Sequence, residues 1–393
     1  MSKSTGALPS ISARALNRAM LARQGLLARQ PVSAEAMLKH LIGLQGQVHN
    51  APYVALWSRL EQFAVSDLEA LLTSRRAVRA TLMRVTLHVA LAEDYLAIRP
   101  LLDSTTLRLF KSNHLKPLKG ADLDEVRAAS RMLLDRETLS PVALGRQLAT
   151  RWPEAKPIDL SMPARFLEPI VHVPPAGLFG ATHPPELTSA RRWLGKRKAA
   201  PMPMETLMRR YLAAFGPATG NDFNTWSGLS GGARVLDAMR PELVSFRGPD
   251  GRELFDLPEA PRPEEATEAP VRLLPDYDNV LLGYADRSRI LPAGAWQGLW
   301  RANGLRPAFT VDGMVRGSWK LTLGKSGARI ALSPFARLRR REEAALQREA
   351  EALLGTVAPG QKVAVDFAAA PVAKRKDPAR GDGRGLRVIR RNG

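Results

Sequence analysis

Two short arms, Leu243-Val244-Ser245-Phe246-Arg247 and Glu253-Leu254-Phe255-Asp256-Leu257, flank the turn residues Gly248-Pro249-Asp250-Gly251. Aliphatic and aromatic arms around a Gly-Pro-Asp-Gly turn predict a β-hairpin. An apolar helical segment begins upstream at Met204, and Thr219 is placed to cap a second helix. Helices followed by a hairpin are the sequence pattern of a winged helix. We therefore predict a winged-helix unit over residues 201–257.

The same order of elements occurs twice more upstream, as a pattern with little residue identity. The first copy runs from Ile11 to about Ala92, and the second begins at Asp122. In the second copy Ser140-Pro141 supplies a helix cap and first helical position, and residues 170–179 are expected to close it with a hairpin. The prediction is an α+β fold, with a tandem winged-helix (helix-turn-helix) array followed by a small C-terminal β domain.

Domain boundaries follow from changes in composition along the chain. Residues 258–270 contain four prolines and four glutamates and are expected to be a linker. The last 20 residues carry eight Lys or Arg and two Asp, which predicts a basic tail. The expected divisions are winged-helix units at 1–118, 119–200 and 201–257, the linker at 258–270, a β-rich domain at 271–373, and the tail at 374–393.

Composition narrows the function classes. The chain has 393 residues, a formal net charge of +20 and no cysteine. Disulfides, thiolate catalysis and cysteine-bound metals are thereby excluded, and the positive charge favours a polyanionic partner. No run of eighteen apolar residues occurs, so neither a membrane span nor a membrane partner is expected. The N-terminus lacks a secretory apolar core, and a cytoplasmic monomer is the expectation.

Two further stretches carry candidate chemistry. Gly43-Leu44-Gln45-Gly46-Gln47 places two glutamines two positions apart, which a regular helix would separate by about 200°. They can address one site only from an extended or turned backbone, which Gly46 permits. About forty residues on, the segment 81–91 alternates apolar and polar side chains, which predicts one strand with Arg84, Thr86 and His88 on its polar face.

These stretches resemble the bacterial AlkZ-like DNA glycosylases. The resemblance rests on the spacing of Gly-Leu-Gln-Gly-Gln and Met-Arg-Val-Thr-Leu-His with two later segments, Phe215-Gly216-Pro217-Ala218-Thr219 and the segment 273–288. It spans roughly residues 11–320. It implies a tandem winged-helix enzyme of DNA repair or genotoxin self-resistance. One departure is visible, because the family usually has an apolar residue between its two polar catalytic residues, where this chain has Gly46.

The resemblance implies that Gln45 and Gln47 are catalytic. A glutamine amide holds no proton at neutral pH, so such a pair would orient water and would not act as a base. That limitation favours substrates with a good leaving group, namely cationic purines alkylated at N7 or N3. The expected partner is therefore double-stranded DNA carrying alkylated bases, with bulky genotoxin adducts or interstrand crosslinks among the substrates. No metal or other cofactor is expected, since the six histidines show no metal-ligand spacing.

Other residues are candidates for supporting the glutamines or contacting DNA. They are Arg84, Thr86, His88, Asp276, Asp278 and Arg287. His88 is equally well interpreted as a structural histidine. The carboxylates at 276, 278 and 286 could include a general base, although capping of turns and pairing with Arg287 or Arg289 is the favoured interpretation.

A non-enzymatic alternative stays open. Winged helices often bind operator sequences, and the Arg-rich segments Leu207-Met208-Arg209-Arg210 and Gly232-Ala233-Arg234 would suit the recognition helices of a transcriptional regulator. A scaffold that binds nucleic acid without selectivity is a third possibility, which rests on charge alone. Release of a free base from damaged DNA would separate the enzyme from both.

Overall fold

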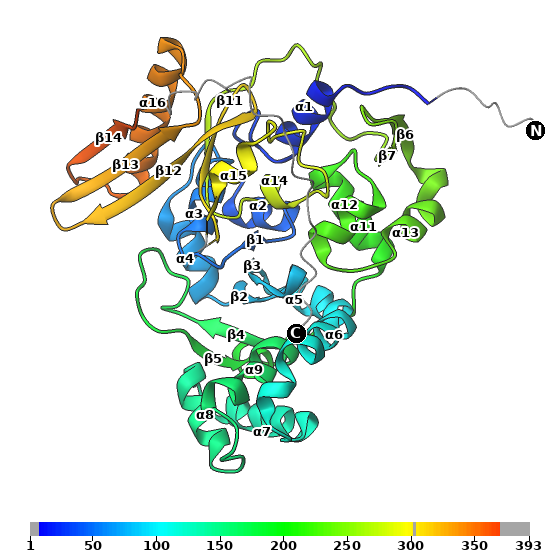
Figure 1. Ribbon diagram of the computed structural model, residues 1–393, viewed down its shortest axis with the longest axis vertical. Helices are drawn as coiled ribbons and strands as arrows, with labels where there is room; N and C mark the ends of the chain where they lie inside the picture. Colours follow the sequence, from blue (N-terminus) through cyan, green and yellow to red (C-terminus); the bar gives the residue numbers. More distant parts are fainter. Residues whose placement is uncertain (1–7, 302–303, 370–393) are drawn as a thin grey trace, which may run out of the picture.

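The computed structural model describes residues 8–301 and 304–369 (Figure 1). In these residues helices pack with two five-stranded and two two-stranded sheets. The fold is mixed α+β, as predicted. The predicted basic tail, 374–393, lies outside the described residues. Figure 1 shows α7, α8 and α9 gathered at one end of the molecule, α11 to α13 at one side, and the hairpin of β12 and β13 with α16 at another corner.

The N-terminal third forms around the first sheet. Serine caps start two of its helices, because the hydroxyls of Ser12 and Ser33 accept hydrogen bonds from the backbone N–H groups of Ala15 and Ala36. The elements in chain order are α1 (Ala13–Arg23), α2 (Ala34–His40), β1 (Leu44–Gln45), α3 (Ala51–Trp57), α4 (Val65–Thr73), β2 (Ala77–Thr81), a 3-10 turn (Met83–Val85), β3 (Leu87–Leu91), α5 (Ala92–Ile98), a second 3-10 turn (Arg99–Leu102) and α6 (Asp103–His114).

The prediction of one strand over residues 81–91 was wrong. Arg84 and Val85 both take left-handed backbone conformations, with φ of 54° and 58°. They end β2 and turn the chain back into β3, so the segment forms the tip of a hairpin. Left-handed φ is unusual for a β-branched residue such as Val85. Residues 81–91 contain no glycine, so nothing in the sequence indicates a turn there.

The second predicted unit contributes three helices and two strands to the same sheet. They are α7 (Leu123–Arg136), α8 (Pro141–Ala149), α9 (Pro157–Leu167), β4 (Ile170–Val173) and β5 (Glu186–Ser189), with a 3-10 turn (Lys116–Leu118) before them and α10 (Ala190–Leu194) after them. The Ser140 hydroxyl accepts from the Ala143 N–H at 3.1 Å, as the predicted cap requires. The hairpin does not close within 170–179. Pro174 and Pro175 have no N–H to continue the ladder, and the return strand begins only at Glu186.

Strand order in this first sheet is β1-β3-β2-β4-β5, all antiparallel. The register places Gln45 opposite His88 and Arg79 opposite His172. Residues from the first and second predicted units therefore share one sheet, and that sheet carries the segment with the two glutamines.

The third predicted unit has the predicted order of elements. It comprises α11 (Met204–Phe215), α12 (Gly220–Ser227), α13 (Gly232–Met239), a 3-10 turn (Arg240–Glu242), β6 (Val244–Arg247) and β7 (Glu253–Asp256). The hydroxyl of Thr219 accepts from the backbone N–H of Asp222 at 3.1 Å, which confirms the predicted cap. In its buried core the rings of Tyr211 and Phe215 are stacked, and the ring of Trp226 is tilted against both.

The predicted linker, 258–270, contains no helix or strand and lies along α1. The side chain of Arg18 is buried and donates to the carbonyl of Thr267 at 2.6 Å. Arg14 donates to the carbonyl of Glu265 at 2.7 Å. These bonds tie the segment between the third unit and the C-terminal region to the first helix of the chain.

The C-terminal region contains the second sheet, of order β14-β13-β12-β11-β8, with α16 packed on it. The elements are β8 (Arg272–Leu274), α14 (Asn279–Leu282), α15 (Ala295–Leu299), β9 (Trp300–Arg301), β10 (Gly304–Leu305), β11 (Ala308–Val311), β12 (Met314–Gly324), β13 (Gly327–Pro334), α16 (Arg340–Val357) and β14 (Val363–Phe367).

A buried ion pair joins this region to the first sheet's helices. Arg59 and Asp278 are both fully buried and make two hydrogen bonds, at 2.7 and 2.9 Å. Asp278 also caps α14 by accepting from the Val280 N–H at 3.0 Å. Asn279, the next residue, donates to the carbonyl of Gly43 at 3.1 Å. The pair therefore supports the backbone that leads into the glutamine segment.

Replacing Asp278 by Ala is expected to lower the free energy of unfolding by about 3 to 5 kcal/mol, because it leaves the guanidinium of Arg59 buried without its counterion. Urea denaturation followed by circular dichroism would measure the change. The matched control is Asp286→Ala, since Asp286 is exposed and pairs with Arg252 only at 3.8 Å. Equal losses in both variants would show that the buried pair contributes nothing beyond a surface pair.

Candidate active site

The two glutamines leave the first sheet in an extended conformation, as predicted. Gln45 ends β1, and the Gly46 N–H donates to the carbonyl of Leu87 at 2.8 Å, so the pairing with β3 continues past the strand. Gly46 is not among the glycines with positive φ. A Cβ there would lie 3.2 Å from Cγ2 of Val89, a tight contact that needs only a small adjustment. An apolar residue therefore fits this position with little change.

The two glutamine side chains lie in different environments. Gln45 is buried, at 7% exposure, whereas Gln47 is exposed. The Oε1 atom of Gln45 accepts a hydrogen bond from the guanidinium of Arg84 at 3.2 Å. Because this bond engages the oxygen, the amide nitrogen of Gln45 is the atom left to donate. The orientation of the amide is thereby set by Arg84.

The turn between β2 and β3 positions Arg84. The Thr86 hydroxyl donates to the carbonyl of Met83 at 3.1 Å, and the Leu82 N–H donates to the carbonyl of Thr86 at 3.0 Å. On the other side, the end of α12 packs directly on the turn, since a Cβ on Gly228 would lie 3.1 Å from Cα of Arg84. Arg84 also donates to the carbonyl of Trp226. The third predicted unit thus holds the arginine that orients Gln45.

His88 lies opposite Gln45 and is 2% exposed. Its Nδ1 atom lies 2.9 Å from the carbonyl of Thr86, so Nδ1 carries the proton in the neutral ring and donates it there. Burial, and secondarily the nearby positive charge of Arg84, lowers the pKa of His88 to about 3. The imidazole is therefore neutral at physiological pH and packs behind the glutamine segment.

Arg79 is a site residue that the sequence analysis missed. It is 3% exposed and donates through Nε to the carbonyl of Gly46 at 2.9 Å. A second nitrogen lies 3.1 Å from Nδ1 of His172, so the neutral imidazole accepts there. Burial, then the charge of Arg79, lowers the pKa of His172 to about 3. The signal in the sequence was an arginine within the otherwise small and apolar strand 77–80.

Four arginines gather around the glutamines without a carboxylate partner in the described part of the chain. They are Arg79, Arg84, Arg165 and Arg287. Burial lowers the pKa of each, to about 10 for Arg79 and Arg84. Arg287 is close enough to Arg84 to lower its pKa further, and its guanidinium lies 4.5 Å from the centre of the Trp296 ring. Arg79 is buried and the other three are half-buried, so the surroundings of the glutamines carry positive charge that no carboxylate in the described residues neutralises.

A small cavity of about 140 Å³ lies beside Gln47. Its lining combines that glutamine with residues of the β2–β3 hairpin and of α9 and β4, namely Thr81, Val85, Leu87, Arg165, Phe166 and His172. The cavity thus joins the first and second predicted units. Its size suits a water molecule with one phosphate group or a sugar edge.

The three candidate carboxylates do not meet at the glutamines. Asp278 caps a helix as expected, but its partner is Arg59, and the predicted pairing with Arg287 or Arg289 was wrong. Asp286 accepts from the backbone and hydroxyl of Ser288. Asp276 lines a separate cavity, and burial raises its pKa to about 6.

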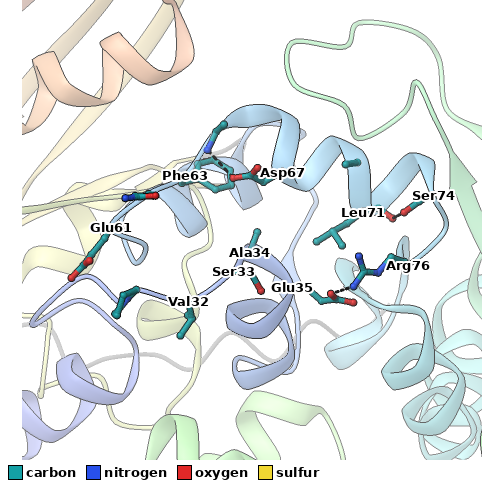
Figure 2. Close-up of a pocket in the computed structure, with 14 residues that line it drawn as sticks. Val32, Ser33, Ala34, Glu35, Glu61, Phe63, Asp67, Leu71, Ser74 and Arg76 are labelled. Carbon is teal, nitrogen blue, oxygen red and sulfur yellow. Dashed lines mark hydrogen bonds and ion pairs between the residues drawn. The ribbon is translucent and has the colours of Figure 1, made fainter.

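A broader cavity of about 1210 Å³ lies elsewhere, between the start of α2 and α4 (Figure 2). The carboxylate of Glu35 pairs there with Arg76, and the carboxylate of Asp67 accepts from the Ala64 N–H at 2.9 Å. These groups serve the local structure and include neither glutamine. Within the described residues, no group of three or more His, Asp or Glu side chains is arranged to hold a metal ion.

Replacing Arg79 by Lys is expected to lower the turnover rate about tenfold or more, because one ammonium cannot hold both the Gly46 carbonyl and His172, and small displacements of reacting groups are costly. Single-turnover assays on a damaged duplex would measure the rate. Arg75→Lys, at an arginine stacked 4.3 Å from the Trp193 ring centre, is the matched control. An unchanged rate with intact folding would show that the carbonyl contact has no part in positioning Gln47.

Comparisons with known proteins place these features in context. The family described as "DNA glycosylase AlkZ-like" matches residues 38–356. A protein of Streptomyces sahachiroi named "Interstrand DNA cross-link repair glycosylase" is 29% identical over 160 residues, 37% of this chain and 40% of that protein. The match thus spans about two fifths of that relative's length. The solved structure of Streptomyces sahachiroi DNA glycosylase AlkZ has a TM-score of 0.75 at 21% identity and covers 91% of this chain and 100% of the other, a likeness of fold.

Proposed function

This chain belongs to the AlkZ-like DNA glycosylase family, and on that premise we propose that it hydrolyses the N-glycosidic bond of purines alkylated at N7 or N3. Such bases are cationic, so the bond is already weakened without help from an acid. The single observation that carries the proposal is the glutamine segment, in which one amide is fixed by Arg84 and the other is exposed beside a small cavity.

The proposed mechanism divides the work between the glutamines. With its oxygen bound to Arg84, Gln45 donates from its amide nitrogen to the oxygen of a water molecule. Gln47 accepts a proton of the same water through its amide oxygen. As the glycosidic bond breaks, its electrons stay with the base, which leaves as a neutral alkylpurine, and C1′ of the sugar becomes positively charged. The water then bonds to C1′ through a lone pair, and the proton that it loses passes to bulk solvent beside the exposed Gln47. Positioning and electrostatics supply the acceleration, and no side chain has to hold a proton.

Arg165 and Arg287, which are half-buried and have no carboxylate partner among the described residues, are proposed to bind the phosphates of the damaged strand. Phosphate contacts fix the position of a protein on DNA without reading its sequence. Their charge would also be neutralised by the DNA, which favours the developing sugar cation beside them. The lesion nucleotide is exposed either by flipping or by opening of the duplex.

We propose that residues 1–118, 119–200 and 201–257 are winged-helix units and that 271–373 is a C-terminal β-rich domain. The helix, helix, helix and hairpin order from Met204 to Asp256 supports the third unit. The name of the Streptomyces relative extends the proposal to interstrand crosslinks. A monomer acting in the cytoplasm is part of the proposal. The described residues contain no helix long and apolar enough to cross a membrane.

The decisive test is release of a free base. The purified protein would be incubated with duplexes carrying N7-methylguanine or a bulky N7 adduct, and the free base would be measured by mass spectrometry. We expect release in many sequence contexts, with weak sequence preference and steep salt dependence of binding to undamaged DNA. Tight binding of one operator with all bases intact would favour a transcriptional regulator and overturn the proposal. Arg210 already argues against that role, since Asp94 engages its guanidinium.

A further inference from the structure

A third cavity, of about 750 Å³, begins at Val48, the residue that follows Gln47 in the chain. Val48 and Asn50, directly after Gln47, form one wall, and the face of β12 around Trp319 forms another. Val48 and Leu323 expose 38% of their surface, and Trp319 packs with its ring nitrogen bonded to the carbonyls of Leu274 and Ala308. The volume falls in the range of small-molecule sites and accommodates a nucleobase with a large substituent.

Asp276 lines this cavity half-buried, and its carboxylate accepts a hydrogen bond from its own backbone but has no cationic partner among the described residues. Its neighbour two positions on behaves differently, because Asp278 is fully buried against Arg59. Between them Tyr277 has a left-handed φ of 57°, which sends the two carboxylates to different environments. A left-handed tyrosine and a half-buried acid without a counterion both cost stability, and the hydrogen bond from its own backbone offsets the second cost only in part, because the pKa of Asp276 stays raised.

The cations of this cavity lie at its edge. Arg306 and Lys320 line it and are both exposed, whereas Asp276 is half-buried. Cationic side chains at the open edge of a cavity can bind phosphates. A carboxylate among apolar walls can bind a cationic group that has a large apolar surface. A nucleotide whose base carries positive charge presents both groups.

We propose that this cavity binds the alkylated base itself and that Asp276 is the residue that selects a cationic base over a neutral one. The inference rests on the proposed function and assigns the substrate's leaving group to a cavity adjoining the glutamine segment. Asp276 is a specificity residue. An anion beside the base stabilises the charged ground state at least as much as the transition state, in which the base is losing its charge. Its removal should therefore weaken binding and leave the chemical step almost unchanged.

The pH dependence of the selectivity for a cationic base follows from the ionisation of Asp276 and from the groups that face it. Burial is the cause that raises its pKa to about 6, so the carboxyl is neutral below that pH and charged above it. The other titratable groups on the facing elements are Arg306, Lys320 and His49, which lies between Val48 and Asn50. The Nδ1 of His49 donates to the carbonyl of Ala181 at 3.1 Å, and burial lowers its pKa. Selectivity for a cationic base should therefore rise with pH through about 6.

The test uses two isosteric duplexes and the full-length protein. One carries N7-methylguanine on a 2′-fluorinated sugar that resists hydrolysis, and the other carries the neutral 7-methyl-7-deazaguanine. Dissociation constants would be measured at fixed ionic strength between pH 5 and 7. We expect the wild type to prefer the cationic duplex about tenfold at pH 7, a difference of about 1.4 kcal/mol, and to lose the preference at pH 5. Asp276→Asn should show no preference at either pH, and Asp286→Asn should behave as wild type.

Kinetics on hydrolysable N7-methylguanine separate this inference from the proposed function. Asp276→Asn should raise KM about tenfold, in line with the lost preference, with kcat within about threefold of wild type. If base is released but the variant keeps the charge preference, the function stands and the assignment of Asp276 is overturned. A fall in kcat at constant KM would also overturn it, because the residue would then act in the chemical step. A charge preference that depends on Asp276 without base release would support the cavity and refute the function.

Discussion

Replacing Gln47 by Ala is expected to lower the rate of base excision by about 10²-fold or more, with little change in affinity for undamaged DNA. The reason is that an exposed amide beside a small cavity adds little to the ground-state complex. Its proposed hydrogen bond to water strengthens as the water attacks C1′. Single-turnover excision and fluorescence anisotropy on matched duplexes would measure the two quantities. Near-wild-type excision by a folded variant would remove Gln47 from the mechanism.

Glutamate variants distinguish the two glutamines. Gln47→Glu keeps an acceptor oxygen and should retain most of the activity. Gln45→Glu removes the only donor that Arg84 leaves available on that side chain, and should lose as much activity as Gln45→Ala. The double alanine variant should lose less than the product of the single losses, because both residues order one water. Multiplicative losses, or equal tolerance of glutamate at both positions, would contradict a shared water held by one donor and one acceptor.

The parts of the fold that could be predicted are those specified by nearby residues. The third unit follows from a cap at Thr219 and a turn at 248–251, and both are confirmed. The hairpin tip at Arg84 and Val85 was predicted as a strand, because its alternation of side chains is that of a strand and its left-handed turn lacks glycine. Besides its local hydrogen bonds, the turn is held by contacts with Trp226 and Gly228, more than 140 residues away.

The candidate site shows the same division. Gln45, Arg84 and His88 were named from the sequence, and the structure brings them together around one strand pair. Arg79 was missed because its role depends on the carbonyl of Gly46, 33 residues earlier in the chain. The partner of Asp278 was predicted among nearby arginines, but the structure pairs it with Arg59, 219 residues away. Patterns in sequence indicate which residues are polar on a given face, but long-range partners depend on packing.

The charge of the leaving group is expected to have the largest effect on rate. The glutamines cannot protonate a departing base, and both histidines behind them, His88 and His172, have pKa values lowered to about 3 by burial. Neither can serve as a general acid near neutral pH. A neutral lesion such as uracil or hypoxanthine would have to leave as an anion beside unassisted water. We therefore expect excision of cationic N7- or N3-alkylpurines to exceed that of these lesions by about 10³-fold or more, since each factor of ten needs only about 1.4 kcal/mol of barrier.

The products and inhibitors of this reaction follow from the same groups. Water is the proposed nucleophile, and no lysine lines the small cavity beside Gln47. The products should therefore be free base and an uncleaved abasic strand, and borohydride should trap no covalent complex, because trapping requires a Schiff base with an amine. Because the proposed mechanism uses no metal ion, chelators should leave the rate unchanged.

Parallel assays of alkylated and uracil-containing duplexes, with and without EDTA, would measure each quantity. Rapid uracil release would reveal a general acid near the base, a trapped adduct would reveal an amine nucleophile, and loss of activity with EDTA would reveal a metal. Each of these results would assign catalysis to another group and contradict the proposed role of the glutamine pair.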